Sequence, residues 1–240
     1  MKSLKIFLAG VVVIVLATTS CNEEIIDIAP IGSPTEDAYF QNEAEMNSAV
    51  LGIYSKMSFF YAWYGGGHIH NVWLLPSDDL TNPGGKATEI FGSLNSGNGD
   101  LNRFYQWNYQ MLARANTVIE KITENGSFAY DENSDMDDYH MGEALFLRAY
   151  NFYLLWNTYG TAPLSASRIK TLADADLPNS KDTELLDQAI LDLREASSLL
   201  PPSWDSANLG RVTSNSANGL LAKILVFRGT VNNTPADFTE

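Results

Sequence analysis

Cysteine and basic residues are both scarce in this sequence. Cys21 is the single cysteine among 240 residues, so no disulfide can form within the chain and its stability must come from packing. Lys and Arg number 15 against 29 Asp and Glu, which gives a net charge of −14. An acidic surface repels phosphate backbones, and this argues against nucleic acid as a partner.

The sequence also lacks a long apolar run near its start. Residues 6–17 form an apolar stretch of 12 residues behind Lys2 and Lys5, whereas a membrane-spanning helix needs about 20. This pattern predicts a signal peptide over residues 1–20. Cys21 stands at the cleavage junction and resembles the cysteine of a lipobox, which implies that its thiol is acylated and becomes the new N-terminus of a lipoprotein. An ordinary signal peptide followed by a free cysteine is the alternative.

The remaining chain is that of a globular protein. Hydrophobic residues make up 45% and charged residues 18% of the sequence, which excludes a disordered chain. Removal of Lys2 and Lys5 with the signal peptide takes the net charge from −14 to −16. Residues 21–32 are acidic and contain Pro and Gly, so we predict a tether there and a folded domain over residues 33–240.

Helical spacing of apolar residues dominates that domain. Ser33 and Asn42 each have the character of an N-cap, with a glutamate three residues later. The spacing predicts an all-α fold of tetratricopeptide-like stacked helical hairpins. The expected helices cover residues 43–58, 101–125, 141–159, 183–200 and 213–228.

Residues 59–100 differ from the rest of the chain. They are rich in aromatic residues and glycine and show no helical period, so we predict a long aromatic-rich loop insertion, with a weak strand signal only at residues 68–75. A loop of this length in a compact domain is usually functional or disordered, and its aromatic content argues against disorder.

Cys21 is followed along the chain by distinctive sequence blocks at residues 34–40, 49–54, 115–119, 142–163 and 211–213. The block at residues 142–163 is the most specific of them. In this order, these features resemble the SusD/RagB family of outer-membrane nutrient-binding lipoproteins.

The resemblance implies a cell-surface lipoprotein, anchored in the outer membrane, that captures oligosaccharides and passes them to a TonB-dependent SusC-like transporter. It implies no catalysis and no cofactor. It also implies a chain of about twice this length, so residues 33–240 correspond to the N-terminal half of the family and the C-terminal half is expected to be missing.

The aromatic-rich loop holds the candidate glycan contacts. Sugar rings stack their C–H faces on aromatic rings, and their hydroxyl groups need polar partners. The alternative is that the rings cap the helical core or meet the missing half of the fold. The candidates are Tyr61, Trp63, Tyr64, Trp73, Asp78, Asp79 and Asn82.

The sequence leaves two functions other than glycan binding open. A glycoside hydrolase needs two opposed carboxylates, and nothing in the sequence singles out such a pair. A helical interaction scaffold at the outer membrane, without a ligand, is the main alternative. The histidines, at positions 68, 70 and 140, are too few to predict a metal site.

Two charged residues in the most apolar helix are expected to have structural roles. Glu143 is expected in the first turn of its helix, where the helix dipole favours a carboxylate. Arg148 is expected to pair with a neighbouring helix.

Overall fold

The described part of the computed structural model is almost entirely helical. It covers residues 38–61, 69–77, 95–125 and 134–239. Across these ranges the only β-pairing is an isolated bridge between Pro163 and Asn179. The elements are α2 (Glu43–Ser58), the π-helical turn η3 (His70–Leu74), α3 (Gly99–Asn125), α4 (Met136–Tyr159), the 3₁₀ turn η5 (Ala173–Ala175), α5 (Glu184–Leu199), α6 (Ser214–Asn232) and the 3₁₀ turn η6 (Pro235–Phe238).

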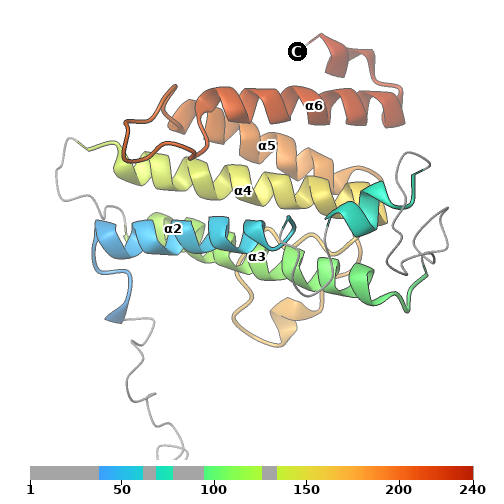
Figure 1. The fold of residues 1–240 in the computed structure, drawn as a ribbon, viewed down its shortest axis with the longest axis horizontal. Helices are drawn as coiled ribbons and strands as arrows, with labels where there is room; N and C mark the ends of the chain where they lie inside the picture. Colours follow the sequence, from blue (N-terminus) through green and yellow to red (C-terminus); the bar gives the residue numbers. More distant parts are fainter. Residues whose placement is uncertain (1–37, 62–68, 78–94, 126–133, 240) are drawn as a thin grey trace, which may run out of the picture. The chain divides into compact units, whose positions relative to one another are not determined.

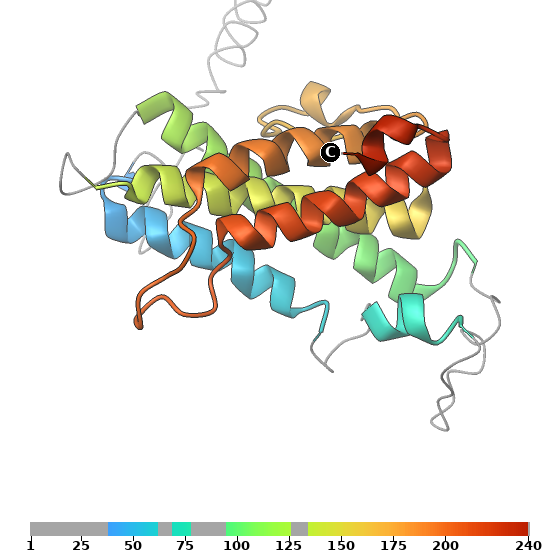
Figure 2. The same cartoon turned by 90° about the horizontal axis from the view of Figure 1, so that it is seen from above.

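Successive long helices alternate in direction, as in stacked helical hairpins (Figure 1). Within the compact unit of residues 40–240, α4 packs against α2, α3, α5 and α6. Helices α2 and α3 therefore lie on one side of α4, and α5 and α6 lie on the other (Figures 1 and 2). The predicted all-α hairpin architecture is confirmed. None of the helices in the described ranges is long and apolar enough to cross a membrane.

The central position of α4 follows from its sequence. A helix that is apolar on most sides is stable only when neighbours cover it, and 13 of its 24 residues are buried. Gly142 lets α5 approach closely, because a Cβ atom there would lie 2.8 Å from Cγ of Leu200. The helix begins at Met136 and not at residue 141 as predicted. Asp137 and Asp138 lie in its first turn, where carboxylates are favoured by the helix dipole.

A buried ion pair connects α4 to α5. The Arg148 guanidinium donates to both carboxylate oxygens of Asp192, at 2.7 Å each. The same guanidinium donates to the side chain of Asn116 on α3 at 3.1 Å and to the carbonyl of Ala166 at 2.8 Å. The predicted pairing of Arg148 with a neighbouring helix is confirmed, and the pair also holds the loop after α4 against α3.

Glu143 has a different role from the one expected. Because α4 begins at Met136, Glu143 lies two turns inside the helix and is completely buried. Its Oε1 accepts hydrogen bonds from Nε of Arg211 and from the hydroxyl of Tyr54, both at 2.7 Å. Glu143 is therefore the centre of an ion-pair network joining α2, α4 and the segment before α6, and the prediction that it serves the helix dipole is wrong.

The strand that the sequence suggested at residues 68–75 is also a wrong prediction. The structure places the π-helical turn η3 there, with Val72 and Leu75 buried and the Asn71 amide bonded to Asp100 at 3.1 Å. β-branched and aromatic residues resemble a strand in sequence, but packing against α3 decides the local conformation.

Asn42 caps α2 as predicted, its Oδ1 accepting from the Glu45 backbone at 3.1 Å. The predicted signal peptide, Cys21, the tether and the helix start at Ser33 lie outside the described residues.

Candidate functional site

The aromatic run that follows α2 is divided between core and surface. Phe60 is completely buried, with its ring centroid 5.1 Å from that of Phe104 and 6.4 Å from that of Trp107. Phe59 and Tyr61 on either side of it are 43% and 57% exposed. The end of α2 therefore presents two aromatic rings to solvent on a buried aromatic support.

Tyr61 contacts α4 through its hydroxyl group. Its hydroxyl shares a hydrogen bond with that of Tyr150, a partly buried residue of α4. Burial, and then the bond to Tyr61, raise the pKa of Tyr150 far above its usual value, so its phenol stays neutral. The bond fixes the ring of Tyr61 while most of its surface stays accessible.

Trp73 connects η3 to the same helix. Its indole N–H donates to the hydroxyl of Thr158 at 2.8 Å, and its ring meets that of Tyr153 edge to face at 6.2 Å. The polar edge of Trp73 is thus already engaged within the protein. Its assignment as a glycan contact stays a prediction.

The other predicted contacts lie outside the described residues: Trp63, Tyr64, Asp78, Asp79 and Asn82. Of the seven candidates, the structure therefore locates Tyr61 and Trp73, and both rest on α4 rather than on each other.

Sequence reasoning missed Lys56, which lies beside the exposed ring of Phe59. Lys56 is only 6% exposed, and its ammonium nitrogen lies 4.3 Å from the ring centroid of Phe59 and 5.3 Å from that of Trp107. Burial lowers the pKa of Lys56, and the positive charge of Arg114 lowers it further. A sequence signal existed, since Lys56 and Phe59 are three residues apart and share a helix face.

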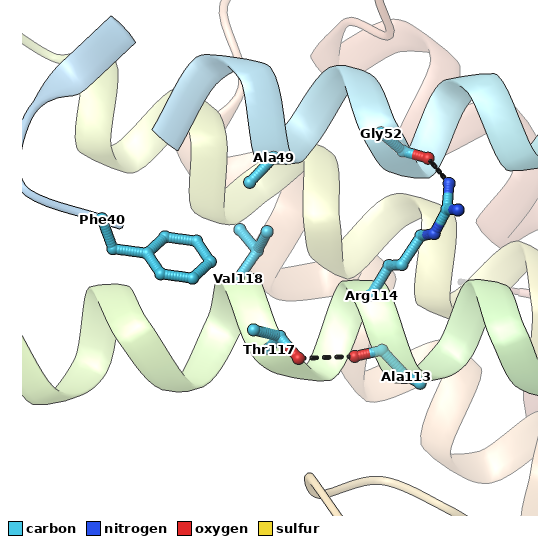
Figure 3. Close-up of a pocket in the computed structure, with 7 residues that line it drawn as sticks. All are labelled: Phe40, Ala49, Gly52, Ala113, Arg114, Thr117 and Val118. Atoms are coloured by element: carbon cyan, nitrogen blue, oxygen red, sulfur yellow. Dashed lines mark hydrogen bonds between the residues drawn. The ribbon is translucent and has the colours of Figure 1, made fainter. Parts of the chain in front are cut away.

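A hollow opens between α2 and α3 (Figure 3). It has a volume of about 330 Å³. The Arg114 guanidinium reaches from α3 to α2, where it donates to the carbonyl oxygen of Gly52 (Figure 3). The hollow exists because the facing positions carry small side chains; its lining is Phe40, Ala49, Gly52, Ala113, Arg114, Thr117 and Val118.

The hollow and the aromatic end of α2 belong to one surface, which we call the α2–α3 seam. Along α2 its residues recur at helical spacing, and along antiparallel α3 they follow in the opposite order. The seam comprises Ala49, Gly52, Lys56 and Phe59 from the α2 side and Trp107, Arg114 and Thr117 from α3.

The described part of the chain offers no other obvious chemistry. No group of three His, Cys, Asp or Glu residues within it could hold a metal ion. His140, which sequence reasoning did not single out as a core residue, is buried in α4.

Comparison with known proteins identifies relatives of this architecture. Residues 77–226, more than half of the chain, match the SusD-like family described as starch-binding and associating with the outer membrane. The chain is 24% identical to SusD-like protein P2 of Formosa agariphila over 225 residues, covering 91% of this chain and 42% of that protein. It is 22% identical to a SusD-like protein of Bacteroides ovatus over 227 residues, covering 92% and 40%.

Solved structures show the same fold. A laminarin-binding SusD-like protein superposes with a TM-score of 0.68 and 21% identity, covering 82% of this chain and 43% of that one. A surface glycan-binding protein A from Bacteroides uniformis superposes with a TM-score of 0.67 and 17% identity, covering 79% and 43%. This chain thus spans about two fifths of the length of the relatives it matches.

Proposed function

Because this chain belongs to the SusD-like family of starch-binding proteins that associate with the outer membrane, we propose that it binds oligosaccharides at the cell surface and passes them to a TonB-dependent SusC-like transporter. The names of two structural relatives, one laminarin-binding and one surface glycan-binding, support the ligand class. The protein acts in this proposal as a binding protein and not as an enzyme.

The observation that carries the proposal is the exposed aromatic surface at the end of α2. Phe59 and Tyr61 are both accessible, and each is held by a contact with a neighbouring helix. Rings fixed in this way can stack on the C–H faces of a sugar with little further loss of conformational freedom. They also stand directly before the segment that holds Trp63 and Tyr64.

The proposed glycan contacts are the predicted residues of this segment. Tyr61, Trp63, Tyr64 and Trp73 would supply rings. The polar partners of the sugar hydroxyls would be Asp78, Asp79 and Asn82.

Substitution of Tyr61 by alanine tests the binding surface. Isothermal titration calorimetry with a panel of neutral and acidic oligosaccharides should show about tenfold weaker binding, since loss of one stacked ring costs on the order of 1.4 kcal/mol. Phe238→Ala is the matched control, because Phe238 is 54% exposed on η6 and its loss should leave the affinity unchanged. Failure of the unmodified chain to bind any member of the panel, together with co-purification of a transporter, would favour the interaction scaffold instead.

Membrane attachment is a separate part of the proposal. We place the lipid on Cys21, which anchors the protein in the outer membrane with the helical domain at the cell surface. Buried acyl chains contribute about 0.8 kcal/mol of membrane affinity per CH₂ group. Mass spectrometry of the envelope protein should find Cys21 acylated and N-terminal, and an intact, unlipidated Cys21 would contradict the anchor.

A further inference from the structure

Lys56 and Arg114 form a pair of neighbouring cations in the α2–α3 seam. Arg114 is anchored to the carbonyl of Gly52, which lies one helical turn before Lys56. Within the described ranges neither side chain makes an ion pair with a carboxylate. The contacts of Lys56 there are the rings of Phe59 and Trp107.

Several other arginines in the fold, in contrast, are paired with carboxylates. Arg148, Arg168, Arg211 and Arg228 each lie within 3.1 Å of a carboxylate oxygen. Carboxylates outnumber basic groups 29 to 15 in the sequence, so acidic partners are abundant. A nearly buried ammonium beside a second cation carries both a desolvation cost and a repulsion, and a bound anion would relieve both.

The surroundings of the pair suit a sugar that carries the anion. The hollow of about 330 Å³ adjoins Arg114, and this volume is at the low end of ligand sites, which is enough for a short part of a longer chain. Phe59 offers an exposed ring beside the ammonium of Lys56. One guanidinium nitrogen of Arg114 is engaged by Gly52, which leaves further N–H donors for a carboxylate.

We propose that Lys56 and Arg114 bind the carboxylate of a uronic-acid residue, with its sugar ring against Phe59 and the neighbouring part of the glycan along the hollow between α2 and α3. The assignment rests on the proposed glycan-binding function and narrows its ligand to acidic oligosaccharides. No carboxylate of the described residues pairs with these two cations, and the carboxylate of the uronic acid supplies the missing negative charge.

Matched probes separate charge from shape. Binding of the purified chain to oligogalacturonate and oligomannuronate is compared, by isothermal titration calorimetry, with binding to their methyl esters, which keep the backbone and lose the charge. The free acids should bind at least about tenfold more tightly than the esters, equivalent to about 1.4 kcal/mol. The preference should shrink as NaCl is raised, since the pair is partly open to solvent.

Two variants test whether Lys56 and Arg114 cause the preference for the free acids. Lys56→Met keeps the aliphatic stem and removes the charge, and Arg114→Gln does the same at an exposed position where the fold is not at risk. Each should reduce the affinity for the acids to nearly that for the esters. Lys181→Gln, which removes an exposed cation ahead of α5, should preserve the preference.

The outcomes distinguish this inference from the broader function. Equal affinity for acids and esters, or a preference that survives both variants, overturns the uronate site while glycan binding stands. An equal loss in Lys181→Gln overturns it too, because the preference would then reflect overall charge. A sulfated oligosaccharide that binds through this pair while uronates do not would also refute the carboxylate assignment. If no oligosaccharide, neutral or acidic, binds, the proposed function itself fails.

Discussion

Burial of His140 predicts that the fold loses stability in mild acid. The side chain is completely buried in α4, and neither ring nitrogen has a hydrogen-bond partner. Burial lowers the pKa of His140 from 6.5 to about 4; the charge of Arg211 acts in the same direction, and Asp137 opposes it. His140 is therefore neutral in the folded protein at pH 7.

The magnitude follows from the two pKa values. Between pH 6.5 and pH 4 the unfolded chain binds a proton at His140 that the folded chain does not, so the free energy of unfolding falls as the pH falls. The full loss is about 3 kcal/mol, because one pKa unit corresponds to about 1.4 kcal/mol. Between pH 7 and pH 4.5 the contribution is about 2 kcal/mol, a large share of the stability of a typical domain.

Urea unfolding followed by tryptophan fluorescence at pH 7 and pH 4.5 measures this loss. Carboxylates also titrate in this range, so the comparison is with His140→Leu, which removes the imidazole and keeps a similar volume. Between pH 7 and pH 4.5 the free energy of unfolding of the variant should fall by about 2 kcal/mol less than that of the parent. At pH 7 it should be at least as stable as the parent, because two unpaired buried nitrogens are gone.

Leu172→Gln serves as the control. Leu172 is 91% exposed and is not ionisable, and its replacement leaves His140 in place, so the acid-induced loss should equal that of the parent. Parent and His140→Leu losing the same free energy between pH 7 and pH 4.5 would refute the reasoning.

The remaining predictions concern packing, charge and capping. Gly142→Ala should destabilise the fold by about 1–3 kcal/mol, because the new Cβ clashes with the end of α5. Gly219→Ala has nothing within 4 Å of its new Cβ and should stabilise the fold by up to about 1 kcal/mol. Equal melting temperatures of the two variants would contradict the close approach of α5 to Gly142. Arg211→Gln should lower the free energy of unfolding, measured by urea titration, by about 3–5 kcal/mol, because Glu143 is left buried without its ion-pair partner. A loss below about 1 kcal/mol would rule out a strong pair. Thr213→Ala should cost about 1 kcal/mol in thermal unfolding by removing the capping box of α6, and an unchanged melting temperature would show that the cap is dispensable.

Most helices could be predicted from the sequence because their signal is local. The predicted range 43–58 coincides with α2, and 183–200 differs from α5 by one residue at each end. The sequence predicts the start of α4 at residue 141, five residues after its actual start, although Asp137 and Asp138 favour a helix N-terminus. The π-helical turn η3 has no local signature that separates it from a short strand.

The candidate site was less predictable because contacts across long sequence separations decide it. Sequence alone indicated an aromatic surface but could not show that Phe60 is buried while its neighbours Phe59 and Tyr61 are exposed. The three-residue spacing of Lys56 and Phe59 was a local signal, but the contact of Lys56 with the ring of Trp107 on α3 was not predictable from it.

By itself, the sequence determined the helical character of the chain, the approximate bounds of its helices and their arrangement as hairpins, because a 3.6-residue apolar period and its caps act over a few residues. Only the tertiary structure decided which aromatic rings reach solvent, that Glu143 pairs with Arg211, and that Lys56 and Arg114 share one seam. The reason is physical: burial and charge pairing depend on how α2, α3 and α4 pack together, and residues that are dozens of positions apart become neighbours only when they do.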